Sequence, residues 1–486
     1  MEREDFAPLE AEMEPLFASA MQRALDYRRS VGQADARPPQ SYAESFEAFS
    51  GPTPENGEAG LSVIETLDRV ARPGLRDIVG PGFFGWVIGA SHPVGVAADW
   101  LTSAWGQNVP NATVAPAAAA AEAAAANWLL DILDLPREAS IGFVTGATAA
   151  HFVGLAAARN ALLRKTGWDV EADGLFGAPP IDVLVGAEAH ATVFSALRYL
   201  GLGARRVTRV ATDSQGRMIP DALASALEGI QAPPLVILQA GHINSGAFDP
   251  AAELIPIAKA HGAWVHVDGA FGLWARACPS RAGLAAGFEA ADSWATDGHK
   301  WLQAPYDCGY AIVRDSEAHQ RAMNITASYL PVADQGERHP SHFVPELSRR
   351  ARGFATWAMI RHLGRSGIAA LVERHCQIAA RMAERLSAEL GVTVLNDVVL
   401  NQLAIRFGEA EAGEAGDRMT LQTVRRLQAD SACFAAEARW RDRAILRISI
   451  SSMATRVEDA DRACDAILAA WRAVRAQSLS PMLEPA

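Results

Sequence analysis

Short apolar runs alternate with segments of helical periodicity between residues 141 and 314. The apolar runs predict strands at 141–145, 181–186, 206–211, 235–240, 264–268, 293–296 and 309–313. Helical segments near 148–164, 191–201, 220–231 and 251–261 lie between them. Strands that are apolar on both faces and alternate with helices are typical of a mostly parallel sheet covered by helices on both sides. The pattern therefore predicts an α/β fold.

The chain on either side of this region has other patterns. Residues 1–78 place apolar side chains at helical spacing and predict a helical arm that packs on another surface. Residues 79–330 form the predicted large domain, and 331–348, rich in proline and without a clear period, form a predicted mobile loop. Residues 349–486 predict a small α+β domain. Its elements are a long helical segment at 354–390, strands near 392–395, 403–407 and 444–449, and a helix near 458–475.

Composition narrows the classes of function. The 486 residues carry a net charge of −12 with no basic run, which argues against nucleic acid or an anionic membrane as a partner. Five scattered cysteines without a CxxC pair favour a reducing compartment and predict neither a disulfide framework nor a metal site. The acidic N-terminus lacks an apolar signal region, so a cytoplasmic protein is expected. A small molecule is the predicted partner.

A census of lysines directs attention to one residue. The chain has three lysines, and Lys165 and Lys259 each lie in the last turn of a predicted helix, where a cation is favoured. Lys300 follows an apolar strand and lies between His299 and Trp301. A lysine in such a place is paired, or its pKa falls and the amine becomes nucleophilic. Lys300 is therefore the candidate for Schiff-base chemistry.

Asp268 ends the apolar strand at 264–268 and precedes Gly269. An Asp before Gly is common as a cap or in a surface turn. It is also the acid that pyridoxal phosphate needs, because a carboxylate beside the ring nitrogen keeps the ring cationic and electron-withdrawing. Its occurrence one or two strands before Lys300 favours the second interpretation.

Two further segments fit the same cofactor. Residues 143–150 read as a strand, a turn of small residues and a helix start, where backbone N–H groups favour an anion, although any tight turn of this kind looks similar. His190 follows the strand predicted at 181–186. A lone histidine is more often a core or cap residue, but here the ring could stack on a cofactor and handle protons.

The chain resembles the group II pyridoxal-phosphate-dependent amino-acid decarboxylases, the family of aromatic-L-amino-acid, glutamate and histidine decarboxylases. The segments that carry the resemblance are Thr145-Gly146-Ala147-Thr148, His190, His266-Val267-Asp268-Gly269-Ala270 and Asp297-Gly298-His299-Lys300-Trp301. Gly82-Phe83-Phe84-Gly85, Glu122 and Ser348-Arg349-Arg350 also match. The resemblance covers roughly residues 80 to 460, and the His-Lys-Trp segment is its most specific part.

The resemblance implies a fold type I homodimer whose active sites lie at the subunit interface and whose N-terminal arm wraps the partner. It implies that Lys300 forms the Schiff base, that Asp268 pairs with the pyridine nitrogen, and that His190 and Ala270 pack on the two faces of the ring. It places Gly146, Ala147, Thr148 and His299 at the phosphate, Trp86 and Val87 at the substrate side chain, and Arg447 at a carboxylate. A sheet-edge role for Arg447 is at least as common. The implied reaction is decarboxylation of an L-amino acid, with the aromatic residues near Trp86 favouring an aromatic substrate.

Two departures from the family pattern affect the chemistry. Gly241-His242-Ile243-Asn244 stands where many members have Gly-Thr-Thr, so Asn244 or Ser245 would replace a hydroxyl contact to the cofactor. Members usually present a tyrosine from the mobile loop as proton donor to Cα, but 330–348 contains no tyrosine; His339, His342 and Phe343 lie there. Either His342 protonates Cα and the product is an amine, or oxygen meets the carbanion and the product is an aldehyde. A carbon–carbon lyase and a pyridoxal-phosphate-binding protein without turnover are more distant alternatives.

Overall fold

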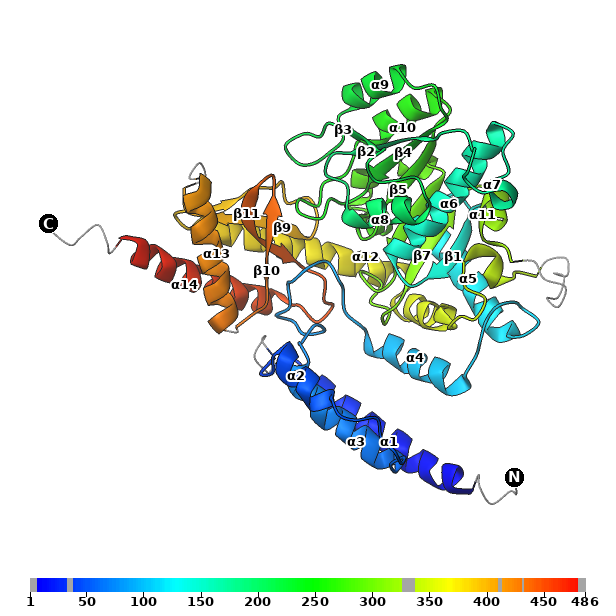
Figure 1. Ribbon diagram of the computed structural model, residues 1–486. Helices are drawn as coiled ribbons and strands as arrows, with labels where there is room; N and C mark the ends of the chain where they lie inside the picture. The colour runs from blue at the N-terminus through cyan, green and yellow to red at the C-terminus, as the bar shows by residue number, and fades with distance from the viewer. Residues whose placement is uncertain (1–6, 33–37, 326–336, 410–412, 431, 480–486) are drawn as a thin grey trace.

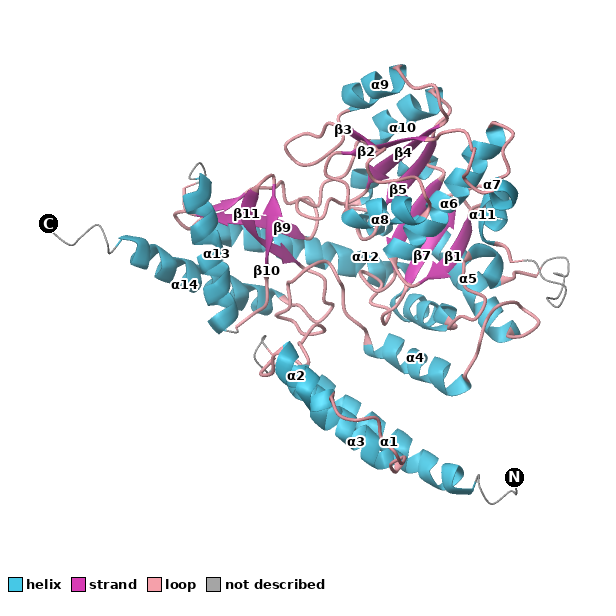
Figure 2. Cartoon of the chain, viewed as in Figure 1, coloured by secondary structure: helices cyan, strands magenta, loops and turns pink. Residues whose placement is uncertain are grey.

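A seven-stranded sheet forms the centre of the larger part of the molecule (Figures 1 and 2). The computed structural model describes residues 7–32, 38–325, 337–409, 413–430 and 432–479. The strand order is β1-β7-β6-β5-β4-β2-β3. Strand β7 is antiparallel to its neighbours β1 and β6, and the other adjacent pairs are parallel. The strands are β1 Ser140–Val144, β2 Asp182–Gly186, β3 Thr208–Val210, β4 Pro234–Gln239, β5 Trp264–Asp268, β6 Ser293–Asp297 and β7 Gly309–Val313. The predicted mostly parallel sheet and its seven strands are confirmed, with ends shifted by no more than about two residues, as is usual for such boundaries.

Helices cover both faces of this sheet. Strand β4 shows why its sequence is apolar throughout: Leu235 and Ile237 pack with α6 and α8, whereas Val236 and Leu238 pack on the opposite side with α5, α9 and α10. The helices of this part are α4 Pro93–Trp105, α5 Pro116–Ile132, α6 Ala147–Lys165, α7 Val170–Asp173, α8 Ala191–Tyr199, α9 Pro220–Glu228, α10 Ala251–Ala260 and α11 Ser316–Met323, with 3-10 turns at Gly272–Ala277, Ala282–Ala285, Phe288–Ala290 and Pro340–Phe343. Helix α11 and the turn Pro340–Phe343 both lie between residues 315 and 348, where the sequence shows no clear period and predicted no element.

A second, antiparallel sheet lies toward the C-terminus, with the order β10-β11-β9-β8 (Figure 2). Its elements are β8 Val392–Val394, β9 Gln402–Phe407, β10 Ala436–Trp440 and β11 Arg443–Ser449, with α12 Arg352–Ser387, α13 Gly413–Asp430 and α14 Val457–Leu479. Sequence reasoning missed α13 and β10, whose exposed faces carry many charged residues and leave only a narrow apolar stripe. The long helical segment predicted at 354–390 is α12, whose backbone breaks at Gly364, where φ is 60°.

The N-terminal arm comprises α1 Ala7–Ser30, α2 Tyr42–Phe49 and α3 Gly60–Ala71, followed by a 3-10 turn at Arg72–Gly74. Helices α1 and α3 lie side by side and extend below the two sheets in Figure 1. Arg23 of α1 donates to Asp68 of α3 at 3.0 Å. Large apolar side chains on the arm face outward, namely Met13, Phe17, Met21, Leu25, Phe46, Phe49, Leu61, Val63 and Leu67. The role of the arm in a dimer and the predicted domain boundaries stay predictions.

A buried ion pair fixes the beginning of the C-terminal region to the large sheet. Arg349 donates to Glu122 of α5 at 2.7 Å and to the carbonyl of Phe143 in β1 at 2.9 Å, and both charged side chains are almost fully buried. Burying two charges is costly unless they are paired, so the pair holds the chain before α12 in one position. No helix among the described residues is long and apolar enough to cross a membrane.

Candidate active site

The carboxyl ends of β1, β2, β5 and β6 lie along one edge of the large sheet, and most of the predicted site residues follow these ends. His190 caps α8 after β2, Asp268 is the last residue of β5, and Lys300 follows β6 by three residues. The charges of Asp268, Lys300 and Arg447 all act on the pKa of His190. The structure thus brings together residues that are as much as 257 positions apart, from 190 to 447. Ligands in such sheets bind beyond the carboxyl ends of the strands.

Lys300 is held by a carboxylate that sequence reasoning did not assign. Its Nζ lies 3.0 Å from Oδ2 of Asp297, whose side chain is only 3% exposed. The other oxygen, Oδ1, accepts the N–H of Ala147 at the beginning of α6. Asp297 therefore connects the lysine to the N-terminus of α6. Its position at the end of a buried strand, like that of Asp268, is the sequence signal that could have identified it.

Asp268 is buried, and Ala270 and His151 both approach the same oxygen of its carboxylate. The N–H of Ala270 lies 3.2 Å from Oδ1, and Nε2 of His151 lies 3.5 Å from the same atom. Burial alone would raise the pKa of Asp268, but the neighbouring His151 and His190 and the Ala270 N–H hold it well below its usual value. Asp268 is therefore an anion at neutral pH, and its two contacts named here leave Oδ2 without a donor in the part of the chain that the structure describes.

His190 presents a neutral ring to this site. Its Nδ1 accepts the N–H of Thr192 at 3.3 Å, and the Thr192 hydroxyl lies 2.8 Å from it, so the ring proton is assigned to Nε2. Burial lowers the pKa of His190, and the charge of Asp268 only partly opposes this. A neutral imidazole is suited to packing on an aromatic ring and carries one transferable proton.

The segment Trp86–Gly89 runs directly against the lysine. A Cβ on Gly89 would lie 2.0 Å from the carbonyl oxygen of His299 and 2.7 Å from Cα of Lys300, so only glycine fits this close approach. Val87, two residues before Gly89, is buried, and Trp86 is 45% exposed. Tyr306, also missed from the sequence, packs against the His299 ring, with 4.8 Å between the ring centres and a tilt of 41°, and donates to the carbonyl of Ile88.

The residues predicted at a phosphate gather at the start of α6. Gly146 is the N-cap of this helix, and a Cβ there would lie 3.3 Å from both Oδ1 of Asp297 and Cε1 of His299. The Ala147 N–H is already engaged by Asp297. A phosphate at this position would use the other backbone N–H groups of the first turn of α6, together with the Thr148 hydroxyl and Nε2 of His299. Burial lowers the pKa of His299, so this ring is a neutral donor.

Asn244 and Arg447 face each other across the boundary between the two sheets. NH1 of Arg447, on β11, donates to Oδ1 of Asn244 at 3.2 Å. The Arg447 Nε is buried and has no hydrogen-bond partner among the described residues. Ser245, the other proposed substitute for a lost hydroxyl contact, donates to the Gln215 carbonyl instead. Arg447 therefore has a donor free for an anion, whereas Ser245 is committed elsewhere.

The remaining predicted residues lie in two places. Ala270 follows Asp268, and its carbonyl accepts the Asp297 N–H at 3.1 Å, so it belongs to the site edge. His342 lies in the turn Pro340–Phe343 and stacks on His339 at 5.1 Å between ring centres. Burial, together with His339 and Arg338, lowers the pKa of His342, so this ring, like that of His190, is neutral at pH 7. Residues 331–336 of the predicted mobile loop lie outside the described residues.

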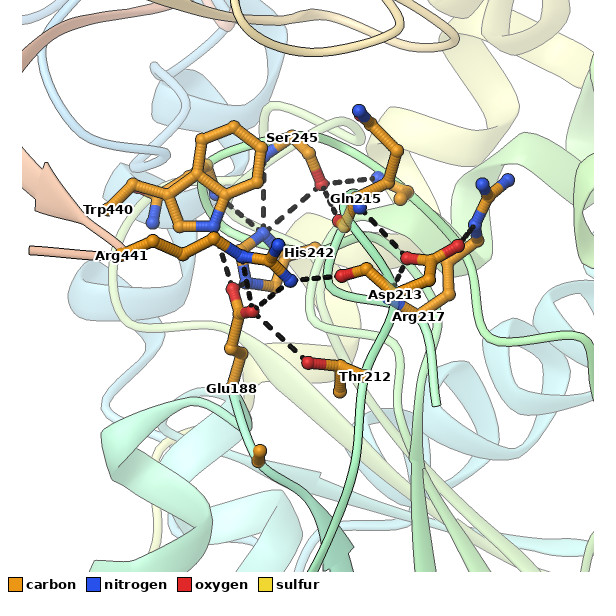
Figure 3. Close-up of polar contacts among 12 residues, drawn as sticks. Glu188, Thr212, Asp213, Gln215, Arg217, His242, Ser245, Trp440 and Arg441 are labelled. Carbon is orange, nitrogen blue, oxygen red and sulfur yellow. Dashed lines mark hydrogen bonds and ion pairs between the residues drawn. The ribbon is translucent and has the colours of Figure 1, made fainter. Parts of the chain in front are cut away.

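A polar network around Glu188 joins the site to the second sheet (Figure 3). Glu188, two residues before His190, accepts from the Trp440 indole at 2.7 Å, from the Arg441 guanidinium at 2.7 Å and from the Thr212 hydroxyl at 3.1 Å. Nε2 of His242 lies 3.3 Å from the same carboxylate. Trp440 is the last residue of β10 and Arg441 lies in the turn to β11, so Glu188 holds this hairpin beside the site.

We expect Glu188→Gln to lower the free energy of unfolding by about 2 kcal/mol at pH 7, the typical loss for hydrogen bonds to a charged group. The donors to Glu188 outweigh its burial and lower its pKa to about 2. Because the folded-state pKa is depressed, this stabilisation is present above pH 4.5 and is lost as the pH falls toward 2. Urea unfolding at pH 7 and at pH 3 measures the effect, and an equal loss at both pH values would contradict it.

Comparisons with known proteins identify relatives of this sequence and of this fold. The model of the pyridoxal-dependent decarboxylase conserved domain matches residues 44–407. An aromatic-L-amino-acid decarboxylase of Bacillus atrophaeus is 28% identical over 367 residues, which cover 74% of each chain. The fold is similar to that of the Oryza sativa TDC solved with PLP and tryptamine, with a TM-score of 0.89, 22% identity and coverage of 95% and 98% of the two chains. It is also similar to that of Rhodiola rosea 4-hydroxyphenylacetaldehyde synthase, with a TM-score of 0.85, 19% identity and coverage of 97% and 99%.

Proposed function

We propose that this chain, which belongs to the family of pyridoxal-dependent decarboxylases, converts an aromatic L-amino acid to the corresponding amine and CO₂. It is a carboxy-lyase whose cofactor is pyridoxal 5′-phosphate. The observation that carries the proposal is the convergence of Lys300, Asp268 and His190 at one edge of the sheet. A lysine amine and a buried anionic carboxylate, side by side, are the two groups that this cofactor requires.

The residues of the site fit the cofactor. Asp268 takes its protein donors on Oδ1 and leaves Oδ2 available, as a carboxylate facing a protonated ring nitrogen must. The Lys300 amine pairs with the Asp297 carboxylate and lies 5.9 Å from the centre of the Phe271 ring. Gly146 and His299 line the start of α6, where an anion is favoured by the helix N-terminus. The orphaned Nε of Arg447 supplies a further donor.

Each of these side chains has one task in the proposed mechanism. Pyridoxal phosphate, when bound, would supply an electron-withdrawing ring that stabilises the electron pair left at Cα. Lys300 would hold the cofactor covalently, and Asp268 would keep a proton on the ring nitrogen. His190 would pack on the ring and exclude water from that face. Arg447 would orient a carboxylate through its Nε donor.

The product depends on what reaches Cα after CO₂ leaves. Formation of the amine requires one proton at Cα, and His190 carries a proton on Nε2 within the site. His342 is the other candidate, and its ring stacks on His339. The alternative product is an aldehyde, formed with consumption of O₂ and water and release of ammonia and peroxide. The absence of a tyrosine in 330–348 favours this alternative.

The substrate class rests on the aromatic side chains beside Trp86. Phe83 stacks on Phe434 at 5.2 Å, and Trp86 lies 5.3 Å from the same ring. Because Trp86 is partly exposed and precedes the segment that touches Lys300, this cluster offers an apolar wall to a substrate side chain.

An amino-acid panel in air tests the proposal. We expect the purified, cofactor-loaded protein to act on phenylalanine, tyrosine or tryptophan at least about tenfold faster than on glutamate. An apolar wall cannot offset the loss of hydration of the charged glutamate side chain. Amine and CO₂ are expected in equal amounts, without peroxide. Aldehyde and peroxide in place of amine would establish the oxidative alternative. Absence of turnover with every amino acid would contradict decarboxylase activity.

A homodimer with shared active sites and a cytoplasmic location complete the proposal. The outward-facing apolar residues of α1 and α3 support the dimer, because such a face is normally covered by protein. Light scattering on the same preparation gives the mass that tests it. The five free, buried cysteines support a reducing compartment.

A further inference from the structure

A chain of buried polar groups extends from Asp268 into the interior, away from the site edge. Nε2 of His151, on α6, lies 3.5 Å from Oδ1 of Asp268, and Nδ1 of the same ring lies 2.9 Å from Nε2 of His266 on β5. Nδ1 of His266 lies 2.8 Å from the Ser293 hydroxyl on β6, which also accepts the Trp264 indole N–H at 2.9 Å. The side chains of His151, His266 and Ser293 are fully buried. The steps described for the proposed function use none of these three side chains.

A glycine in α6 allows the helix to pack closely on the sheet at this chain of polar groups. A Cβ on Gly154, one turn beyond His151, would lie 2.9 Å from Cε1 of His266. Glycine at this position therefore lets α6 approach β5 closely enough for the two imidazoles to meet. The rings cross edge to face, with 5.2 Å between their centres and an angle of 71°.

The donors in this chain all point the same way. An indole N–H can only donate, so Ser293 accepts from Trp264 and its own hydroxyl proton is available to Nδ1 of His266. The direction is set at the other end of the chain, where the Asp268 anion favours a proton on Nε2 of His151, so that Nδ1 of His151 accepts from Nε2 of His266 and Nδ1 of His266 accepts from Ser293. The proton of His151 is in turn on Nε2, which faces Asp268. Burial lowers the pKa of His266 well below its usual value, which keeps that ring neutral, as this assignment requires.

We propose that His151 is a positioning residue for the proposed decarboxylation, and that the chain Trp264–Ser293–His266–His151 fixes its tautomer so that an N–H always faces Asp268. The proposal rests on the proposed function, in which Asp268 faces the ring nitrogen of the cofactor. His151 stabilises the Asp268 carboxylate as an anion and leaves its second oxygen directed at the cofactor. Outer-shell partners of this kind orient the groups that touch the reacting molecule.

His151→Phe tests the role, because phenylalanine preserves the ring but removes both nitrogens. We expect the Kd for pyridoxal phosphate to rise by about tenfold and kcat to fall by about 10- to 100-fold, the usual effect of losing an outer-shell partner. His151→Gln places an amide N–H near the position of Nε2 and is expected to recover most of both losses. Equilibrium dialysis against the cofactor gives the Kd independently of turnover.

Asn160→Ala is the matched control for loss of a buried polar side chain from the same helix. Asn160 is fully buried in α6 and bonds to Glu171 and Arg321, away from Asp268. We expect it to lower the melting temperature without changing the Kd for the cofactor. An equal rise in Kd for His151→Phe and Asn160→Ala would reduce His151 to a packing residue and overturn the proposal.

The tautomer is measurable without cofactor, which separates this proposal from the proposed function. Nitrogen-15 NMR of the cofactor-free protein labelled at its 12 histidines, assigned by comparison with His151→Gln and His266→Gln, reports which nitrogen of each ring carries the proton. We expect Nε2 in both rings at pH 7. A proton on Nδ1 of His151 would overturn the proposed direction of the hydrogen bonds from Ser293 to Asp268. An Nε2 proton together with an absence of amino-acid turnover would instead contradict only the proposed function.

Discussion

Lys300→Ala is expected to abolish the visible absorbance of the cofactor-loaded protein and to lower turnover by on the order of 10³-fold or more, as removal of a covalent catalytic group does. The amine that holds the cofactor is lost, while Asp268, His190 and the fold around them remain. Difference spectra before and after addition of pyridoxal phosphate measure the absorbance. Reduction with borohydride and mass mapping would identify the modified peptide in the parent protein.

The small number of lysines provides a sharp control. A Lys165→Ala, Lys259→Ala double variant retains Lys300 as its only lysine. Lys165 is exposed and contacts a backbone carbonyl, and Lys259 pairs with Asp292 at the opposite edge of the sheet. The double variant is expected to keep both the absorbance and the turnover. Persistence of the absorbance in Lys300→Ala would show that another amine holds the cofactor.

The alternation of apolar runs with helical segments was sufficient to predict the large sheet, because strands buried on both faces are apolar along their whole length. The same rule explains which elements were missed. Helix α13 and strand β10 each expose a face and carry charges on it, so their apolar positions are sparse. Such elements are identified only when the surface that covers them is known.

Residues of the site were predictable where a charged side chain occurs in an otherwise apolar segment. Lys300 and Asp268 are charged side chains at the ends of apolar strands, and each needs a partner. His151 gave no such signal, since it lies in the first turns of an alanine-rich helix and its importance depends on His266, which is 115 residues away. Glu188 likewise acquires its role only when the β10–β11 turn folds back onto β2. Contacts between distant segments follow from the fold and are not encoded in local spacing.

Asp268→Asn is expected to retain the Lys300-dependent absorbance but to lower kcat by about 10³-fold. The substitution preserves the shape of the side chain and removes the charge that keeps a proton on the ring nitrogen. An ion pair at contact distance in a partly buried site is worth about 4 kcal/mol, and each 1.36 kcal/mol of barrier is about tenfold in rate. Asp292→Asn is the matched control, because Asp292 bonds to the N–H of Val265 at the other end of the same strands. If Asp268→Asn turned over substrate about as fast as Asp292→Asn, the cofactor ring would not depend on the Asp268 carboxylate. The site would then lack the group that makes the bound cofactor able to support decarboxylation.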